Sequence, residues 1–402
     1  MTAAKDGSEN SDESRLPRRD WILLPALGLL TIFLMAGSSE LLSRLAFRRT
    51  ARSVGSCIVV NDPSTGARGI PNCVIRVQGV EGPSVEYRFN SCGHRAGMEC
   101  GPKPSGAYRI VMAGSSIALG ELVPWEQTFA ALLPREISAR TGRNVELYNE
   151  GMGWGFPHST TLKFNNVLAA QPDLILWMLN PVDIQRTSEV LPTADLDPWP
   201  TLSLPAKAWK RLQADVAAGS PAATASELFG RTRTAFILRH WLYESPSLYL
   251  ESFLAADDSQ AGFLKVQHSA LWKSRLTHFD SDAADIEARA RTAGVPFVAF
   301  LVPTRAQAAM ISMGEWPKGY DPYKLGDEVH AIVASHGGIY LDILQDFRNI
   351  PNAAQYFYPV DTHPDARAHA IISALVAKAL TDGSVPALKA PSNPLLVSEK
   401  SK

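Results

Sequence analysis

Apolar and polar residues follow two different periods along residues 107–383, and these periods predict the elements of one domain. Five short, mostly apolar runs are typical of strands buried within a sheet. They are Tyr108–Ala113, Val145–Tyr148, Leu174–Leu179, Val295–Val302 and Gly338–Leu344. Between most of them apolar residues recur at helical spacing, as at Phe129, Leu133 and Ile137. Alternating strands and helices predict an α/β fold with a mainly parallel sheet.

An excess of chain separates the third predicted strand from the fourth, at about residues 186–282. A crossover between parallel strands needs far fewer residues, so we predict a helical insertion that forms a cap beside the sheet. Four of the nine tryptophans lie in it: Trp199, Trp209, Trp241 and Trp272. We expect them to pack in the core of the cap rather than to form a platform for a sugar ring.

The longest uncharged apolar stretch lies near the N-terminus, at Trp21–Gly37. Its length is close to about 17 residues, the shortest helix that spans a bilayer. A cleaved signal peptide remains an alternative, because Ala36 and Gly37 are small enough for a cleavage site. We favour an uncleaved anchor over residues 20–48, since Glu40 and Arg44 would end the span at the membrane interface.

All four cysteines lie just beyond this stretch, at Cys57, Cys73, Cys92 and Cys100. Their number is even and none forms a C-x-x-C pair, which favours two disulfides over a zinc or redox site. Among the three connectivities we favour the local one, Cys57 with Cys73 and Cys92 with Cys100. Disulfides need an oxidising compartment. We therefore expect a single-pass protein of the inner membrane, with its main domain in the periplasm or outside the cell.

The expected organisation has five parts. They are a disordered cytoplasmic tail (1–19), a membrane anchor (20–48), a disulfide-pinned lead-in (50–106), the α/β domain (107–383) and a disordered tail (384–402). The formal net charge of the 402-residue chain is −1, so it has no electrostatic footprint for nucleic acid. The sequence holds no H-E-x-x-H, P-loop or dinucleotide-binding motif, and we expect neither a metal nor a cofactor.

Polar and small residues follow the strands that the apolar runs predict. The segments are Gly114–Ser116 after the first strand, Asn149–Gly155 after the second, Asn180–Asp183 after the third, and Tyr358–His369 before the last helix. Ligands of doubly wound sheets bind at the carboxyl ends of the strands. A serine, a glycine-rich loop, an asparagine and an Asp-x-His motif therefore converge on one edge of the sheet.

In these segments the chain resembles the SGNH hydrolases, also called the GDSL esterase/lipase family. The block "GSSIALG" matches the family's first motif and implies that Ser116 is the nucleophile. "GMGWG" matches the second and places the oxyanion glycine at Gly153, while Asn180 matches the third. Asp361 and His363 match the last. The resemblance implies a flavodoxin-like, doubly wound parallel sheet, the SGNH hydrolase fold.

The resemblance covers about residues 85–383, with the insertion unmatched, and it has three departures. Ser115 stands where the family usually has Asp. Two residues separate Asn180 from Asp183, where the family usually has Asn and Asp together. The glycine-rich loop also admits Gly155 in place of Gly153. The upstream "FNSCGHRAG" is similar to an element of the bacterial membrane-anchored members.

The chemistry of the residues agrees with these assignments. A serine hydroxyl becomes nucleophilic only when a base takes its proton. His363 would be that base, and Asp361, two residues earlier, would fix its orientation and tautomer. The backbone N–H groups of Ser116 and Gly153 and the amide of Asn180 would stabilise the oxyanion.

Structural interpretations of some of these residues stay open. Asn180 could cap a turn before Pro181, and Asp361 could cap the last helix. His369 is expected to be a structural residue within that helix. His94 and His158 are expected to be surface or loop residues.

Three functions are compatible with these features. The first is a membrane-anchored, extracytoplasmic serine esterase that removes acyl groups such as acetyl from a carbohydrate or a lipid. The second is an O-acyltransferase with the same triad, which modifies an exported or cell-surface polysaccharide. Because the anchored relatives include polysaccharide acetylation proteins, the resemblance implies polysaccharide-export or acetylation machinery as partners. The third, a non-catalytic carbohydrate-binding protein, is disfavoured by the complete Ser, His and Asp set.

Overall fold

Five parallel strands form the central sheet of the protein. They are β5 (Ala107–Ala113), β6 (Asn144–Asn149), β7 (Leu174–Leu179), β8 (Phe297–Leu301) and β9 (Ile339–Leu341). Their order across the sheet is β6-β5-β7-β8-β9. Numbered from β5, this is the order 2-1-3-4-5 of flavodoxin-like sheets. The predicted doubly wound parallel sheet is therefore confirmed, and each strand lies within its predicted apolar run or extends it by one residue at one or both ends.

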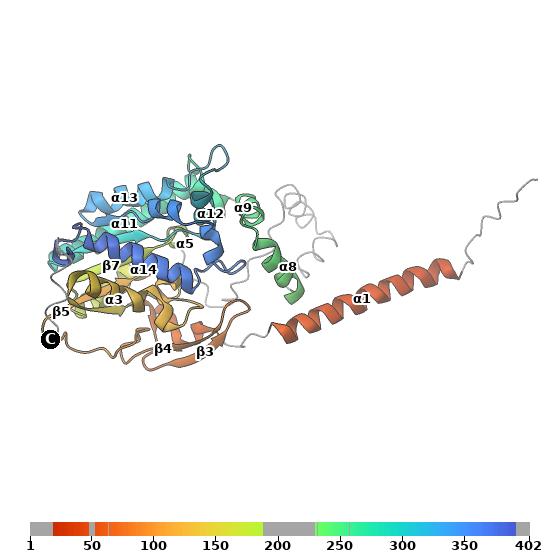
Figure 1. Cartoon of the computed structure of the whole chain (residues 1–402), viewed down its shortest axis with the longest axis horizontal. Coiled ribbons are helices and arrows are strands. Elements are labelled where there is room, and N and C mark those ends of the chain that lie inside the picture. Colours follow the sequence, from red (N-terminus) through yellow and green to blue (C-terminus); the bar gives the residue numbers. More distant parts are fainter. Residues whose placement is uncertain are drawn as a thin grey trace, which may run out of the picture.

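This computed structural model describes residues 19–47, 53–62, 64–187, 230, 232–256 and 258–390. Helices cover both faces of the sheet (Figure 1). On one face α3 (Phe129–Thr141) packs against α14 (Ala366–Thr381), and on the other α11 (Ala270–Thr292) packs between α4 (Pro157–Ala169) and α13 (Lys324–His336). Because both faces are covered, every residue of β7 and β8 is buried.

The lead-in consists of two antiparallel hairpins. β1 (Ile58–Asp62) pairs with β2 (Gly66–Gly69), and β3 (Val74–Gln78) pairs with β4 (Ser84–Arg88). Both expected disulfides are present, Cys57–Cys73 and Cys92–Cys100. The hairpins share a small apolar cluster with Leu119, in the short helix after β5, and with Met152, in the loop after β6. The lead-in therefore supports the edge of the sheet where the candidate residues lie.

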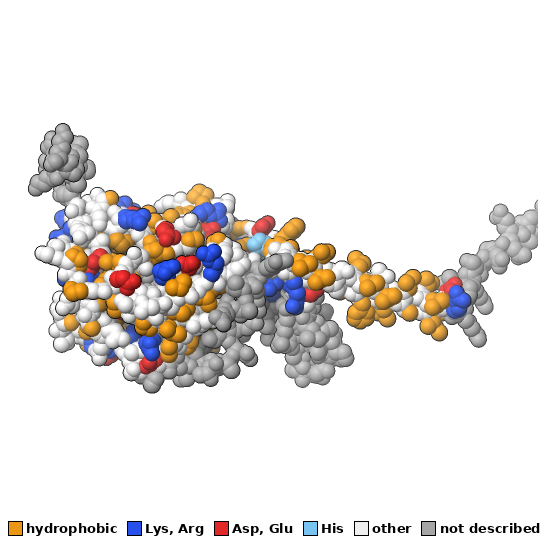
Figure 2. Space-filling model, turned by 90° about the horizontal axis from the view of Figure 1, so that it is seen from below, with side chains coloured by type: hydrophobic (Ala, Val, Ile, Leu, Met, Phe, Trp, Pro, Cys, Tyr) orange, Lys and Arg blue, Asp and Glu red, His pale blue; other side chains and the backbone are white. Residues whose placement is uncertain are grey.

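The N-terminal helix α1 (Asp20–Ala46) stands away from the body (Figure 1). It is long and apolar enough to cross a membrane, as an anchor or a signal sequence would be. Its apolar side chains are exposed along the helix (Figure 2). Near its end, Glu40 accepts hydrogen bonds of 3.0 Å from the backbone N–H groups of Arg233 and Thr234.

The described part of the insertion contains three helices, α8 (Arg233–Tyr243), α9 (Pro246–Leu254) and α10 (Asp258–Ala261). The expected end of the insertion at residue 282 falls inside α11, and α11 is the crossover helix from β7 to β8. Trp272, on α11, is fully buried as expected, but Trp241 on α8 is 69% exposed. Trp199 and Trp209 lie outside the described residues.

The C-terminal segment differs from the expectation of a disordered tail beginning at residue 384. Residues 384–390 are ordered and include a short 3-10 helix, Pro386–Leu388. Val385 and Leu388 are buried in the main core, where this segment contacts α14. Burial of these two apolar side chains stabilises the ordered segment. The expected tails over residues 1–18 and 391–402 lie outside the described residues.

Candidate active site

Ser116 follows the carboxyl end of β5 directly. It begins a short helix, α2 (Ser116–Leu119), and as first residue its backbone N–H has no partner within the helix. The turn needs glycine at Gly114, whose φ is +154°, and a Cβ there would lie 2.7 Å from the Met178 carbonyl oxygen. The close approach of β5 and β7 thus sets the position from which Ser116 projects.

Ser116, His363 and Asp361 form a hydrogen-bonded chain at this edge. The Ser116 Oγ lies 2.8 Å from the His363 Nε2, and the His363 Nδ1 lies 2.6 Å from the Asp361 Oδ1. With the Nδ1 proton facing the carboxylate, Nε2 is left to accept the serine proton. The three groups have the relative positions that activation of a serine nucleophile requires.

The charges around His363 favour its protonated form. Burial is the largest single effect on the pKa of His363 and by itself would lower it, but the neighbouring carboxyl groups, Asp361 foremost, together outweigh burial. With Glu121 and Asp183, Asp361 raises the pKa to about 9. An imidazolium at this position is therefore stabilised, whereas the neutral form predominates only in alkaline solution.

The loop that carries Asp361 and His363 is held by its own backbone. The N–H of Tyr358 donates to the His363 carbonyl at 2.9 Å, and the N–H of Thr362 donates to the Tyr358 carbonyl at 3.0 Å. Thr362 adopts a left-handed conformation with φ of 69°, which turns the chain between the two side chains. Asp361 does not cap the last helix, because the N-cap of α14 is Asp365.

Gly153 lies in the loop after β6, close to this edge. The N–H of Gly155 donates to the Met152 carbonyl at 2.8 Å, so it is already used inside the loop. The N–H of Gly153 has no such partner among the residues that the structure describes. Hydrogen bonding within the loop therefore favours Gly153 over Gly155 as an oxyanion donor.

Asn180 has a structural role that the sequence left open. Its side chain accepts a hydrogen bond of 3.0 Å from the N–H of Val182 and forms a capping box with Asp183 at the start of α5 (Pro181–Gln185). Its Nδ2 donates to the Val302 carbonyl at 3.1 Å. An amide has two N–H bonds, so one remains for an oxyanion.

Two acidic residues near His363 were not predicted from the sequence. The Glu121 Oε2 lies 3.9 Å from the His363 Nε2, and burial raises the pKa of Glu121. Burial likewise raises the pKa of Asp183 to about 7, although the Ser115 hydroxyl and the Asn180 N–H donate to its carboxylate. The only sequence signal for Glu121 is its distance of five residues from Ser116, just after a glycine turn.

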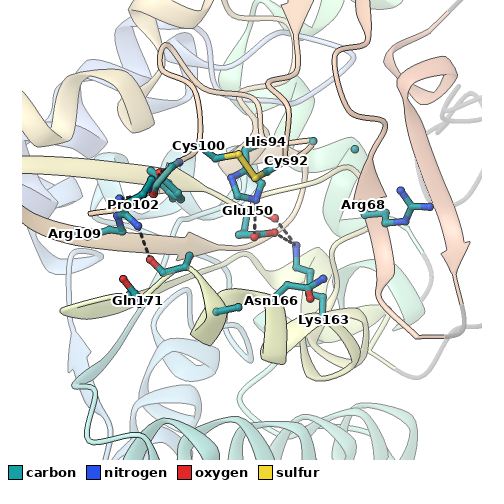
Figure 3. Close-up of a pocket in the computed structure, with 16 residues that line it drawn as sticks. Arg68, Cys92, His94, Cys100, Pro102, Arg109, Glu150, Lys163, Asn166 and Gln171 are labelled. Atoms are coloured by element: carbon teal, nitrogen blue, oxygen red, sulfur yellow. Dashed lines mark hydrogen bonds and ion pairs between the residues drawn. A yellow bond between two sulfur atoms is a disulfide. The ribbon is translucent and has the colours of Figure 1, made fainter. Parts of the chain in front are cut away.

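A cavity of about 630 Å³ lies away from the triad, between the lead-in and α4 (Figure 3). None of the triad residues lines it. The Glu150 carboxylate pairs with the His94 Nε2 at 2.7 Å and with the Lys163 Nζ at 3.9 Å. His94, expected to be a surface or loop residue, lies in a loop but is only 7% exposed, because the Glu150 carboxylate is the hydrogen-bond partner of its buried ring. Glu150 thus joins the lead-in to α4 and stabilises their packing.

The other two histidines considered in the sequence, His369 and His158, have the structural positions expected for them. His369 is fully buried and its Nδ1 accepts a hydrogen bond of 3.1 Å from the N–H of Phe129. His158 has a side chain that is 65% exposed. Within the described ranges, no group of three or more His, Cys, Asp or Glu side chains could hold a metal ion.

No protein-family model and no curated protein matches this chain. Solved structures with a similar fold include the lipase/acylhydrolase from Enterococcus faecalis, at 12% identity and a TM-score of 0.33 over 68% of this chain and 95% of that one. An acetyl-xylooligosaccharide esterase from Geobacillus is 11% identical, with a TM-score of 0.37 over 68% and 94%. A protein described as lipolytic and of the G-D-S-L family, from Desulfitobacterium hafniense, is 10% identical, with a TM-score of 0.34 over 68% and 99%. These similarities concern the fold alone.

Proposed function

We propose that this protein is a serine esterase that hydrolyses acyl esters, such as acetyl esters, of a carbohydrate or a lipid. The observation that carries the proposal is the chain of hydrogen bonds from Ser116 through His363 to Asp361, at 2.8 Å and 2.6 Å. It lies at the carboxyl edge of a parallel sheet, where ligands of such folds bind.

The reaction begins when His363 takes the hydroxyl proton of Ser116 as its Oγ attacks the ester carbonyl carbon. The tetrahedral intermediate carries an oxyanion, which the N–H groups of Ser116 and Gly153 and the Asn180 amide stabilise. Each such donor lowers the activation barrier by roughly 3 kcal/mol. His363 then gives its proton to the leaving alcohol, and the acyl group stays on Ser116. Water attacks this acyl-enzyme with His363 as base and releases the acid.

We also propose that α1 anchors the protein in the inner membrane as a single span, with the catalytic domain in the periplasm or outside the cell. The supporting observations are the exposed apolar surface of α1 and the two disulfides of the lead-in. Disulfides persist in oxidising compartments. The substrate is then an acylated molecule of the envelope or of the exterior.

The test uses the full chain in detergent, assayed on p-nitrophenyl acetate. The wild type should release p-nitrophenol and should be labelled at Ser116 by a phosphonate ester inhibitor, as mass spectrometry can show. Ser116→Ala and His363→Ala should each abolish turnover, and the double variant should lose little more, because triad members act as a unit. Ser115→Ala is the matched control and should cost far less. Phosphonylation at another residue, or an active Ser116→Ala variant, would refute the proposal.

An O-acyltransferase is the second candidate, and Glu121 is the observation that favours it. Its carboxylate lies 3.9 Å from the nitrogen that must deprotonate the incoming nucleophile, where it could accept a hydrogen bond from a sugar hydroxyl. Such an enzyme would work beside polysaccharide-export or acetylation machinery. Adding acetyl-acceptor oligosaccharides to the assay separates the two functions, since a transferase yields acetylated sugar and an esterase yields acetate.

A further inference from the structure

The carboxylate of Glu81 is buried directly beside the loop that carries the triad acid. Glu81 lies in the turn between β3 and β4 and is 5% exposed. It accepts hydrogen bonds from two consecutive backbone N–H groups, that of Val360 at 3.1 Å and that of Asp361 at 2.7 Å. A residue of the lead-in therefore binds the backbone of Asp361 itself.

The third donor to Glu81 comes from the insertion. The Nδ1 of His240, on α8, lies 2.6 Å from the Glu81 Oε1. This contact raises the pKa of His240, which favours an imidazolium beside the carboxylate. A buried carboxylate is stable only when donors or a counter-charge surround it, and Glu81 has both.

A buried arginine holds the other side of the same loop. Arg305, 1% exposed, donates from Nη1 to the Pro359 carbonyl at 2.6 Å and from Nε to the Ala354 carbonyl at 3.2 Å. It also donates to the carbonyl of Tyr243, at the end of α8. The loop is thus bound by an anion at its N–H groups and by a cation at its carbonyl groups.

We propose that Glu81 is a positioning residue of the triad, held in place by His240, and that it orients Asp361 toward His363. The inference rests on the proposed function of the triad. The carboxylate fixes the peptide unit from which the Asp361 side chain projects, and the left-handed Thr362 follows at once. Without it, the buried N–H of Val360 and the partly buried N–H of Asp361 lose their acceptor, and the loop must relax to satisfy them. The Asp361 carboxylate then moves away from the His363 Nδ1.

The informative variant is Glu81→Gln. An amide keeps the size of the side chain, but its NH2 group is a donor and would face other donors, the N–H groups of Val360 and Asp361. In the p-nitrophenyl acetate assay kcat should fall about 100-fold, as a displacement of about 1 Å can cause. KM should change less than about twofold, because Glu81 is buried and its carboxylate is occupied by donors of the protein. Glu86→Gln is the matched control, since Glu86 lies on the same hairpin but pairs with the exposed Arg76 and Arg88.

His240 supplies a second, milder series in case Glu81→Gln folds poorly. His240→Phe removes the donor and should lower kcat in the same direction, whereas His240→Gln keeps an N–H donor and should restore most of it. If His240 only stabilises the fold, both variants should have a lower melting temperature, but His240→Phe and His240→Gln should have the same kcat. Equal kcat values for the two variants would contradict the proposal.

A measurement that needs no substrate separates this inference from the proposed function. With ¹⁵N-labelled histidine, NMR titration of the full chain follows the pKa of His363, which should be near 9 in the wild type. Glu81→Gln should lower it, because Asp361 no longer faces the imidazole, and Glu86→Gln should leave it unchanged. An unchanged pKa in Glu81→Gln overturns the positioning role even if the protein is an esterase. A lowered pKa in a protein without esterase activity supports the positioning role and refutes the esterase.

Discussion

At the scale of single residues, His363 determines the pH at which the proposed reaction runs. As a general base it must be neutral before it can accept the Ser116 proton. Three carboxyl groups near it, those of Asp361, Glu121 and Asp183, raise its pKa to about 9 although burial acts in the opposite direction. The neutral fraction therefore increases as the pH rises toward this value, and activity increases with it.

We predict that kcat/KM rises with pH and levels off above about pH 9. Glu121→Gln should shift this limb to lower pH, because removal of a nearby negative charge destabilises the imidazolium. The measurement is kcat/KM on p-nitrophenyl acetate between pH 6 and pH 10, corrected for spontaneous hydrolysis. Glu126→Gln, a carboxylate five residues further along, is the control. If kcat/KM rises over the same pH range in Glu121→Gln and in the wild type, Glu121 does not raise the pKa of His363 and the prediction is wrong.

At the scale of elements, the start of α5 combines a helix cap with a catalytic candidate. Asn180 accepts from the N–H of Val182 and donates to the carbonyl of Val302, so it ties the end of β7 to the end of β8. The same side chain retains an N–H for the oxyanion. The start of a helix, which needs a cap, and the proposed reaction, which needs a donor, would thus use one residue.

Two substitutions separate these roles of Asn180. Asn180→Ser keeps a capping oxygen but loses the amide donor, and kcat should fall about 100-fold, while the melting temperature falls only as far as loss of the hydrogen bond to Val302 requires. Asn180→Ala loses both, and should in addition lower the free energy of unfolding by about 1 kcal/mol. Thermal unfolding and kcat are measured for both variants. Wild-type kcat in Asn180→Ser would remove Asn180 from the oxyanion site and leave only its cap.

At the scale of the whole molecule, the lead-in and the insertion meet the catalytic loop from two sides. The Cys57–Cys73 disulfide closes a loop within the hairpin cluster that packs on Leu119 and Met152. Glu40 of α1 accepts from the first N–H groups of α8, and α8 carries His240. Parts of the chain outside the parallel sheet therefore support the edge where the triad lies.

We predict that reduction of the disulfides weakens the fold and lowers activity. A cross-link that closes a loop of this length contributes roughly 3 kcal/mol, mainly by restricting the unfolded chain. The melting temperature should fall on addition of a phosphine reductant, and a Cys57→Ser/Cys73→Ser variant should reproduce the fall without reductant. Four free thiols in protein purified without reductant, counted by mass spectrometry, would contradict the disulfides and the oxidising compartment together.

We predict that the mature protein keeps α1. Cleavage of a signal peptide near Ser38 would place Glu40 next to a new, mobile terminus and would weaken its hydrogen bonds to Arg233 and Thr234. N-terminal sequencing of the protein from native membranes should therefore find residues that precede α1. A terminus near Ser38 would instead identify a signal peptide, and the soluble domain would then be released from the membrane.

The sequence by itself determined the features that depend on local pattern. The periods of apolar residues were sufficient for the five strands, and they placed Ser116 at the carboxyl edge of the sheet because it directly follows the first of them. Asp361 and His363 follow no predicted strand, and it was their Asp-x-His motif before the last helix that grouped them with Ser116. The even number of clustered cysteines predicted two disulfides, and the local pairing favoured among three connectivities is the one present. Periodicity and spacing report which residues share a face or a turn, and these are properties of short segments.

Only the tertiary structure decided the contacts between distant segments. Glu81 bonds to the N–H of a residue 280 positions away, so no spacing or motif could connect the two. The burial of His94 depends on Glu150, and that of Val385 and Leu388 on a core that α14 completes. In each case, whether a charge is neutralised or an apolar side chain is covered depends on a neighbour that comes close only when the whole chain has folded.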